Sequence, residues 1–329
     1  MNKELIFKRV AFSSATLILV LLVSIFVMLF ISAKPAMSEY GLNFLTDSSW
    51  GKIVQIKSDK PQTTKQVKKT APQSEDLFAN QDSPMFSDST AATDNQPQEE
   101  IKTKTIYGGF IPIMGTILAT LIAMIFSLPI AMGIAVFLSE IAPKFLVKPV
   151  GIAIELLAAI PSIIYGMWGL FYFAPIVQKI VGGSQISLLT AGLVLGIMIL
   201  PFMAAITRDA MNTTPDVLKE SAYSLGATKF EVVKDIIFPY AKVGIIGSVI
   251  LSLGRALGET MAVAFLIGSV FKVTSLTSPT ISIPVVLANN FGEADGQMMS
   301  SLFYLAFVLF VLSFAVIGLA KFYFLRGRR

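Results

Sequence analysis

The sequence predicts an all-α membrane protein with six transmembrane helices. Its mean hydropathy is +0.72 and 54% of its 329 residues are hydrophobic, whereas only 14% are charged. A soluble domain carries roughly 25% charged residues. Several apolar runs also reach or exceed the ~20 residues that a helix needs to cross a bilayer. A chain of this composition is expected to lie in lipid.

The six expected spans are apolar runs separated by polar segments. They cover residues 10–31, 114–138, 150–174, 186–207, 243–270 and 302–320. Basic residues precede the first run, as they would in a signal peptide. That run is nevertheless longer than the 7–15 residues typical of a signal peptide, and no convincing small-residue cleavage site follows it. We therefore expect a span that is retained.

Lysine and arginine are distributed unequally among the segments that connect the spans. One set of segments is basic: Lys3, Lys8 and Arg9 at the start, Lys144 and Lys148, Arg208 to Lys242, and Lys321 to Arg329. The two short loops on the other side carry only Lys179 and Lys272. Basic residues favour the cytoplasmic side, so both termini and the 208–242 loop are predicted to be cytoplasmic.

The connection between the first two spans is unusually long. Residues 51–104 are rich in Gln, Thr, Ser, Asp, Lys and Pro and contain few large apolar side chains. Such a segment cannot bury enough apolar surface to offset the entropy of ordering, so it is expected to be disordered. The chain then divides into an N-terminal segment with the first span (1–33), a periplasmic loop with this insert (34–109) and a membrane core (110–329).

Residue types that are missing exclude several functions. The chain has no Cys and no His, which excludes thiolate or imidazole metal sites and a Ser–His–Asp triad. It also has no Gly-rich phosphate-binding loop that ends in Lys-Ser/Thr. We expect no catalytic residue, no metal and no cofactor. The net charge of +5 is attributed to cytoplasmic anchoring residues, not to a surface for nucleic acid.

The polar loop after the fourth span has a helical pattern. Thr214 is placed to cap a helix, with Pro215 in its first position, and Gly226 is placed to end it. Four residues form the apolar face of this helix, namely Val217, Leu218, Ala222 and Leu225. A second short helix with Phe230, Val233, Ile236 and Ile237 is expected to end at Pro239. The prediction is two short helices hinged at Gly226.

This loop resembles the coupling motif in the permease subunits of ABC importers. The family pattern is Glu-Ala-Ala, three residues, Gly, nine residues, Ile, one residue and Leu-Pro. The corresponding residues here are Glu220, Ser221, Ala222, Gly226, Ile236 and Phe238-Pro239. The spacing is intact, and Ser221 and Phe238 replace the Ala and Leu of the pattern conservatively. The resemblance implies a coupling helix that docks into a groove of a separate ATP-hydrolysing subunit. An amphipathic helix on the membrane surface explains the apolar face but not the full spacing.

Two of the expected spans carry a more specific family resemblance than the coupling motif. ELLAAIPSIIYGMWGLFYFAP (155–175) and LGRALGETMAVAFLIG (253–268) resemble the third and fifth spans of the PstC family of phosphate permeases. The resemblance implies a type I ABC importer permease fold in the bacterial inner membrane and a non-catalytic pathway for inorganic phosphate. It also implies three kinds of partner: a homologous second permease (PstA-like), an ATP-binding dimer (PstB-like) and a periplasmic phosphate-binding protein (PstS-like).

Three ionisable residues lie inside the expected spans, namely Glu155, Arg255 and Glu259. Each costs about 2.5 kcal/mol or more at mid-bilayer, so each needs a partner or a polar cavity. Glu155 is close enough to its span end to reach the interface. Arg255 and Glu259 are four residues apart and would share one helix face, flanked by Gly254 and Gly258. They form either a structural ion pair or, as the resemblance favours, part of the substrate pathway.

Two rival functions remain open from the sequence. The first is a permease for another oxyanion or solute that shares the coupling motif. The second is a secondary transporter or channel that needs no ATPase, which would leave the coupling spacing unexplained.

Overall fold

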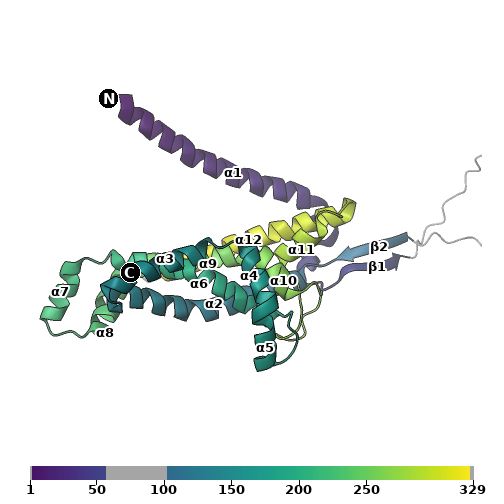
Figure 1. Cartoon of the computed structure of the whole chain (residues 1–329). Helices are drawn as coiled ribbons and strands as arrows, with labels where there is room; N and C mark the ends of the chain where they lie inside the picture. The colour runs from purple at the N-terminus through teal and green to yellow at the C-terminus, as the bar shows by residue number, and fades with distance from the viewer. Residues whose placement is uncertain (1, 57–101, 327–329) are drawn as a thin grey trace, which may run out of the picture. The chain divides into compact units, whose positions relative to one another are not determined.

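The computed structural model describes residues 2–56 and 102–326 and is mostly helical (Figure 1). Within these residues, six helical segments have the length and composition to cross a membrane. They are Glu4–Leu45, Phe110–Ile141, Ser162–Val181, Leu188–Asn212, Lys229–Leu257 and Gly296–Phe322. Each segment overlaps one expected span. The predicted all-α membrane fold is confirmed.

The helices divide these segments further. In chain order they are α1 (Asn2–Tyr40), α2 (Phe110–Val136), α3 (Lys144–Ala159), α4 (Ser162–Trp168), α5 (Ala174–Val181), α6 (Leu188–Asn212), α7 (Asp216–Ser224), α8 (Lys229–Glu231), α9 (Phe238–Leu257), α10 (Met261–Ile267), α11 (Ile283–Asn290) and α12 (Gly296–Arg326). A 3₁₀ turn, Gly41–Leu45, follows α1, and π-helical turns occupy Phe137–Ile141, Gly169–Phe173 and Val232–Ile237.

The chain forms two compact units, residues 1–50 with 107–329 and residues 51–106. The strands β1 (Trp50–Ile56) and β2 (Lys102–Tyr107) pair as a two-stranded sheet. The disorder predicted for 51–104 is therefore wrong at both ends of that segment. β-Branched residues such as Ile53, Val54 and Thr103 favour strands there. The rest of that prediction falls on residues 57–101, outside the described residues.

The helices α2 and α6 pack closely along small residues. Five such residues on α2, four apart in sequence, are completely or almost completely buried: Ala119, Ala123, Ser127, Ala131 and Ala135. On α6, a Cβ at Gly192 would lie 2.7 Å from Ile122, and one at Gly196 would lie 3.0 Å from the carbonyl oxygen of Ala123. Small residues bring helix backbones together in membranes, where the hydrophobic effect does not drive helix association.

The helix α1 contacts α12 through aromatic rings at its C-terminal part. Phe307 lies 5.4 Å from Phe26 and 5.7 Å from Phe30, measured between ring centroids. Phe44 stacks on Tyr304 at 4.4 Å, and the Tyr304 hydroxyl donates to the carbonyl oxygen of Gly41 at 3.0 Å. The side chains of residues 4–28 are all exposed. Lipid or another subunit would cover this part of α1 in a membrane.

The third span is not the continuous helix predicted for 150–174. α3 ends at Ala159 and α4 begins at Ser162, with extended backbone at Ile160 and Pro161 between them. Proline lacks an N–H and disfavours helical backbone in the residue before it, which explains the break. The apolar segment long enough to span then runs from Ser162 to Val181.

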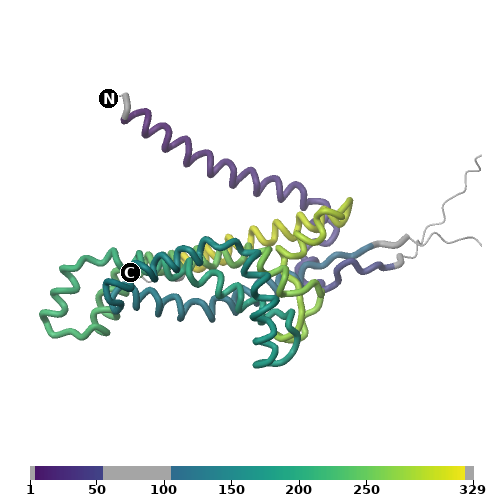
Figure 2. Tube along the Cα trace, in the orientation of Figure 1, coloured from purple at the N-terminus to yellow at the C-terminus, as the bar shows by residue number. Residues whose placement is uncertain are grey.

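The fifth span, predicted as continuous over 243–270, is also interrupted. α9 ends at Leu257 with Gly258 as its C-terminal cap, and α10 begins only at Met261. Glycine is a poor helix former, and a helix end at this position leaves Glu259 outside both helices. Figure 2 shows the chain passing from α10 through an extended loop into α11.

Backbone hydrogen bonds join that loop to the connection between α5 and α6. The N–H groups of Ser184, Leu188 and Leu189 donate to the carbonyl oxygens of Thr277, Ser278 and Leu276, at 2.8 to 3.1 Å. Ser187 donates its N–H to Leu266 at 2.9 Å. These loops form the end of the bundle opposite the end that carries α7 (Figures 1 and 2).

Candidate functional site

The coupling motif forms a helical hairpin at one end of the bundle (Figure 1). α7 ends at Ser224, and Gly226 follows with a φ of +90°. The N–H of Gly226 donates to Tyr223 at 2.9 Å, and that of Ala227 donates to Ala222 at 3.1 Å. Glycine adopts a positive φ without the steric cost that other residues incur. The predicted role of Gly226 as the end of this helix is confirmed.

The start of α7 differs from the prediction. Pro215 is the capping residue, with extended backbone, and Asp216 is the first helical residue. Thr214 lies one position too early to cap the helix. Its Oγ1 is buried and has no hydrogen-bond partner among the described residues.

The second helix of the hairpin does not end at Pro239, as the sequence predicted. Thr228 and Glu231 form a capping box at its start, in which the N–H of Thr228 donates to Glu231 Oε2 at 2.7 Å. The π-helical turn Val232–Ile237 then leads into α9, and Pro239 lies in the first turn of α9. A π turn changes the hydrogen-bond register, which accommodates the missing N–H and the ring of the proline. The second helix of the hairpin and α9 thus form one continuous helical segment, Lys229–Leu257.

The hairpin packs against the ends of α2 and α6. Val232 and Ile237 are buried in a cluster with Ala135 of α2 and Met211 of α6. Three motif residues, Ala222, Ile236 and Phe238, pack against the same cluster. The remaining motif residues Glu220, Ser221, Gly226 and Pro239 are exposed, as are the large apolar side chains of Val217, Leu225 and Phe230. Exposed apolar side chains next to a motif indicate a surface for another protein.

An ion pair that the sequence did not predict joins α7 to the turn that follows α2. Lys219 Nζ lies 2.8 Å from Glu140 Oε1, and the two side chains are only 15% and 11% exposed. Glu140 lies in the π-helical turn that continues α2. The two residues are 79 positions apart, so no local spacing could have indicated the pair.

Arg255 and Glu259 lie on either side of the point where the fifth span is interrupted. Arg255 is exposed in the last turn of α9, with its Cζ 5.6 Å from the centroid of the Phe202 ring. Glu259 follows the end of α9, and its Oε1 accepts a hydrogen bond from the Ala262 N–H at 3.2 Å. The expectation that both share one helix face is wrong, because the helix ends between them. No ion pair joins the two residues, both of which belong to the described part of the chain.

The two glycines that flank this pair have different roles. A Cβ at Gly254 would lie 3.3 Å from Ile317 Cδ1, so Gly254 allows α12 to approach α9 closely, as expected. A Cβ at Gly258 would meet only the carbonyl oxygen of Gly254, at 3.9 Å. Gly258 therefore ends a helix, and no helix of the described residues packs against it.

The family described as "Binding-protein-dependent transport system inner membrane component" matches residues 117–328. The chain belongs to this family. It is therefore a non-catalytic, multi-pass component of the inner membrane, and the matched segment includes the hairpin and the interrupted span.

Similar proteins are consistent with this membership. The phosphate transport system permease protein PstC of Pasteurella multocida is 47% identical over 67% of this chain and 75% of its own length. PstC of Mesorhizobium japonicum is 37% identical over 98% of this chain and 90% of its own length. The resemblance to PstC permeases is confirmed. A crystal structure of the inward-facing MetNI methionine ABC transporter matches with a TM-score of 0.51 at 19% identity, covering 65% of this chain and 92% of that one, which shows a shared fold.

Glu155, the third ionisable residue within the expected spans, forms an ion pair with Arg208. Its Oε1 lies 3.3 Å from Nη2 of Arg208, which also contacts Asp209 at 2.9 Å. Gly151 leaves space for the guanidinium, because a Cβ there would lie 2.6 Å from Nη1 of Arg208. The pair joins α3 to α6. It gives Glu155 a structural role that the sequence analysis did not specify.

A small internal cavity connects Glu259 with α2. Its lining includes Glu259, Thr116 and Thr120 of α2, and Ser282. The hydroxyls of Thr120 and Ser282 are buried and have no hydrogen-bond partner in the described ranges. Thr116 is satisfied, because its Oγ1 accepts from the N–H of Ile283 at 2.9 Å. Polar groups from three separate segments thus meet beside the interrupted span.

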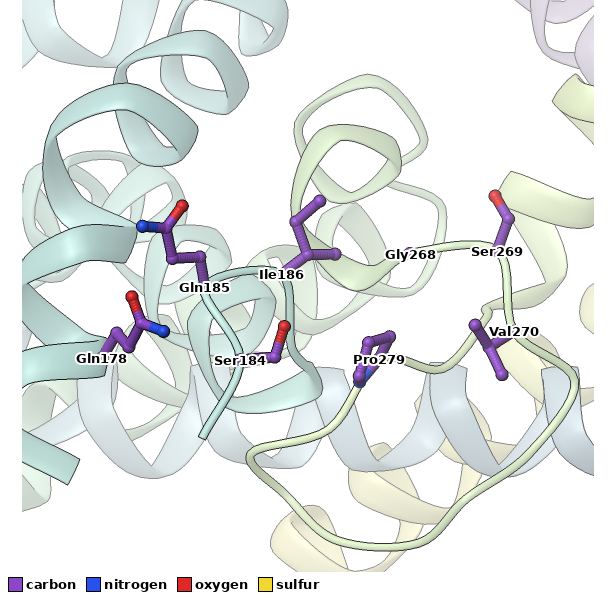
Figure 3. Close-up of a pocket in the computed structure, with 8 residues that line it drawn as sticks. All are labelled: Gln178, Ser184, Gln185, Ile186, Gly268, Ser269, Val270 and Pro279. Carbon is purple, nitrogen blue, oxygen red and sulfur yellow. The ribbon is translucent and has the colours of Figure 1, made fainter. Parts of the chain in front are cut away.

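A larger, open hollow of about 500 Å³ lies at the end of the bundle opposite the hairpin (Figure 3). Its lining residues are Gln178, Ser184, Gln185, Ile186, Gly268, Ser269, Val270 and Pro279. None of these eight is charged, so the hollow offers no cation to a free anion. In the described part of the chain, no group of three Asp or Glu residues is placed to hold a metal ion.

Proposed function

We propose that this chain forms half of the membrane pathway of an ATP-driven importer for inorganic phosphate. The observation that carries the proposal is the similarity to PstC permeases over nearly the whole chain, at 37% identity across 98% of it. The intact coupling motif indicates that a separate subunit hydrolyses ATP.

Arg255 is the proposed phosphate contact. It is exposed beside an interruption of the fifth span, and irregular backbone inside a membrane is tolerated where it lines a cavity or is buried in protein. Transporters commonly bind their substrates at such discontinuous helices. The guanidinium fork gives phosphate two parallel hydrogen bonds and stays charged at any cellular pH. Glu259 does not neutralise the guanidinium charge of Arg255, because its carboxylate accepts a hydrogen bond from α10 instead.

Glu259 is the second proposed pathway residue. One carboxylate oxygen is held by the Ala262 N–H, which fixes the side chain at the start of α10. The carboxylate could then accept a hydrogen bond from a protonated phosphate oxygen, a group that fully ionised sulfate lacks.

The hairpin is proposed to dock into the ATPase. Glu220, Ser221 and the apolar side chains of Val217, Leu225 and Phe230 form its exposed surface. The partners are a homologous PstA-like permease, a PstB-like ATPase dimer and a PstS-like periplasmic phosphate-binding protein. With the hairpin and both termini in the cytoplasm, the hollow of Figure 3 faces the periplasm. Nucleotide-driven closure of the ATPases would then alternate the opening of the permease pair.

The test is uptake of labelled phosphate by proteoliposomes that contain the assembled complex and its binding protein. We expect uptake that requires internal ATP and is not suppressed by excess sulfate. Uptake of a different oxyanion in preference to phosphate would show that phosphate is not the preferred substrate. Uptake without any ATPase subunit would instead favour a secondary transporter.

A further inference from the structure

The ion pair between Lys219 and Glu140 joins α7 to the turn that continues α2. Lys219 lies on α7, and Glu140 continues α2. Their 2.8 Å contact is nearly buried, whereas the other carboxylate near Lys219, that of Asp216, is 3.8 Å away and 88% exposed. Removing one member of a nearly buried pair leaves the other charge without a partner and without full hydration. Glu140 is therefore the main partner that holds Lys219.

Apolar packing reinforces this contact. Val232 and Ile237 of the hairpin are buried against Ala135, which lies five residues before Glu140 on the same rod. Ser139 Oγ also approaches the sulfur of Met211 at 3.6 Å, which connects this end of α2 to α6. Movement of α7 is thus resisted by charge and by packing at the same place.

The other part of α2 contacts the segments beside the interrupted fifth span. Thr116 bonds to the backbone of Ile283, and Thr116 and Thr120 line the same internal cavity as Glu259. A helix rises about 1.5 Å per residue, so the path from Glu140 to Thr120 is about 30 Å long. Close packing of α2 on Gly192 and Gly196 of α6 keeps these helices together over that path.

We propose that α2 transmits the movement of α7 to residues 258–260, and that the Glu140–Lys219 ion pair couples α7 to α2. Both are positioning residues, since neither contacts the proposed phosphate site. The direction of transmission, from α7 toward residues 258–260, rests on the proposed function. Coupling between distant sites is carried through rigid elements that are joined by discrete contacts.

The experiment compares Glu140→Gln, Lys219→Gln and a reversed pair in reconstituted complexes. The reversed pair, Glu140→Lys with Lys219→Glu, is made together with Asp216→Asn so that two carboxylates do not lie side by side. Asp216→Asn alone is the control, because it alters the exposed neighbour of the same lysine. The quantity measured is phosphate imported per ATP hydrolysed, normalised to assembled complex.

We expect each single variant to hydrolyse ATP while importing about tenfold less phosphate per ATP, within the usual range of coupling between two sites. The control should match the unmodified complex, and the reversed pair should recover most of the ratio. An unchanged ratio in the single variants overturns the proposal. So does an equal fall in hydrolysis and import, because that pattern reports only a weakened fold.

A second measurement does not depend on the substrate. This chain has no cysteine of its own, so when it is labelled before assembly, Ser224→Cys and Ile125→Cys carry its two spin labels, one on α7 and one on α2. With the pair intact, the distance between labels should stay the same when ATP is trapped; in Glu140→Gln it should change. No change in Glu140→Gln refutes the coupling role. If the unmodified complex imports no phosphate while the labels behave as expected, only the proposed substrate fails.

Discussion

Gly226 allows a direct test of the hairpin turn. Its φ of +90° lies in the region that favours glycine, and no atom lies within 4 Å of a Cβ built there. A substitution therefore introduces backbone strain but no clash. Asn tolerates positive φ, whereas a β-branched residue does so rarely. Gly226→Val and Gly226→Asn consequently separate conformation from the mere presence of a side chain.

The size of the effect follows from the strain alone. A residue forced into a sparsely populated backbone region costs about 1–3 kcal/mol. Replacing glycine also restricts the unfolded chain, which offsets about 0.4–1 kcal/mol of this. The turn in Gly226→Val should be destabilised by about 1–2 kcal/mol net, which corresponds to about a 5- to 30-fold larger open population. Gly226→Asn should change that population by no more than about threefold.

Amide hydrogen exchange across Asp216–Ser224 measures this population, and phosphate uptake per assembled complex measures its consequence. We expect faster exchange and reduced uptake in Gly226→Val, with Gly226→Asn close to the unmodified protein. Equal impairment of both variants would refute the conformational reasoning and indicate that any side chain blocks the docking surface. Normal uptake in a well-assembled Gly226→Val variant would count against a coupling role for the turn.

Three further results are expected. A cysteine at Lys229 should be labelled by an impermeant maleimide only after the cytoplasmic side is opened, and labelling from outside would reverse the topology. An Arg255→Met, Glu259→Leu double variant should assemble but not import phosphate, and Arg255→Lys should fail substantially, because a point charge lacks the planar fork; recovery of import in the double variant would refute a pathway role for both residues. Gly196→Leu should destabilise the complex by about 1–3 kcal/mol through overpacking against α2, measured as a lower Tm. Gly133→Leu should leave the Tm unchanged, because a Cβ at Gly133 meets no atom within 4 Å.

The sequence predicted the features that depend on local composition and spacing. The six spans follow from the length of apolar runs, and Gly226 follows from the end of a helical pattern. The family follows from the spacing between Glu220 and Pro239. Each of these signals lies within a few tens of residues, where periodicity is informative.

The breaks in the third and fifth spans were not predicted, because apolar composition continues across Pro161 and Gly258. Length and hydropathy do not distinguish one helix from two halves. The Glu140–Lys219 pair was missed for another reason, since only the packing of α2 against the hairpin brings these residues together. The correction at Pro239 has a related cause: a π turn absorbed a residue that normally ends a helix.

The backbone bonds between the α5–α6 connection and the loop after α10 limit how the pathway can open. Separating these segments would break the four backbone hydrogen bonds described above, each of which contributes about 0.5–1.5 kcal/mol net. We therefore expect the α5–α6 connection and the loop after α10 to move as one unit. The proposed pathway would then open elsewhere, along the face that carries the exposed Arg255.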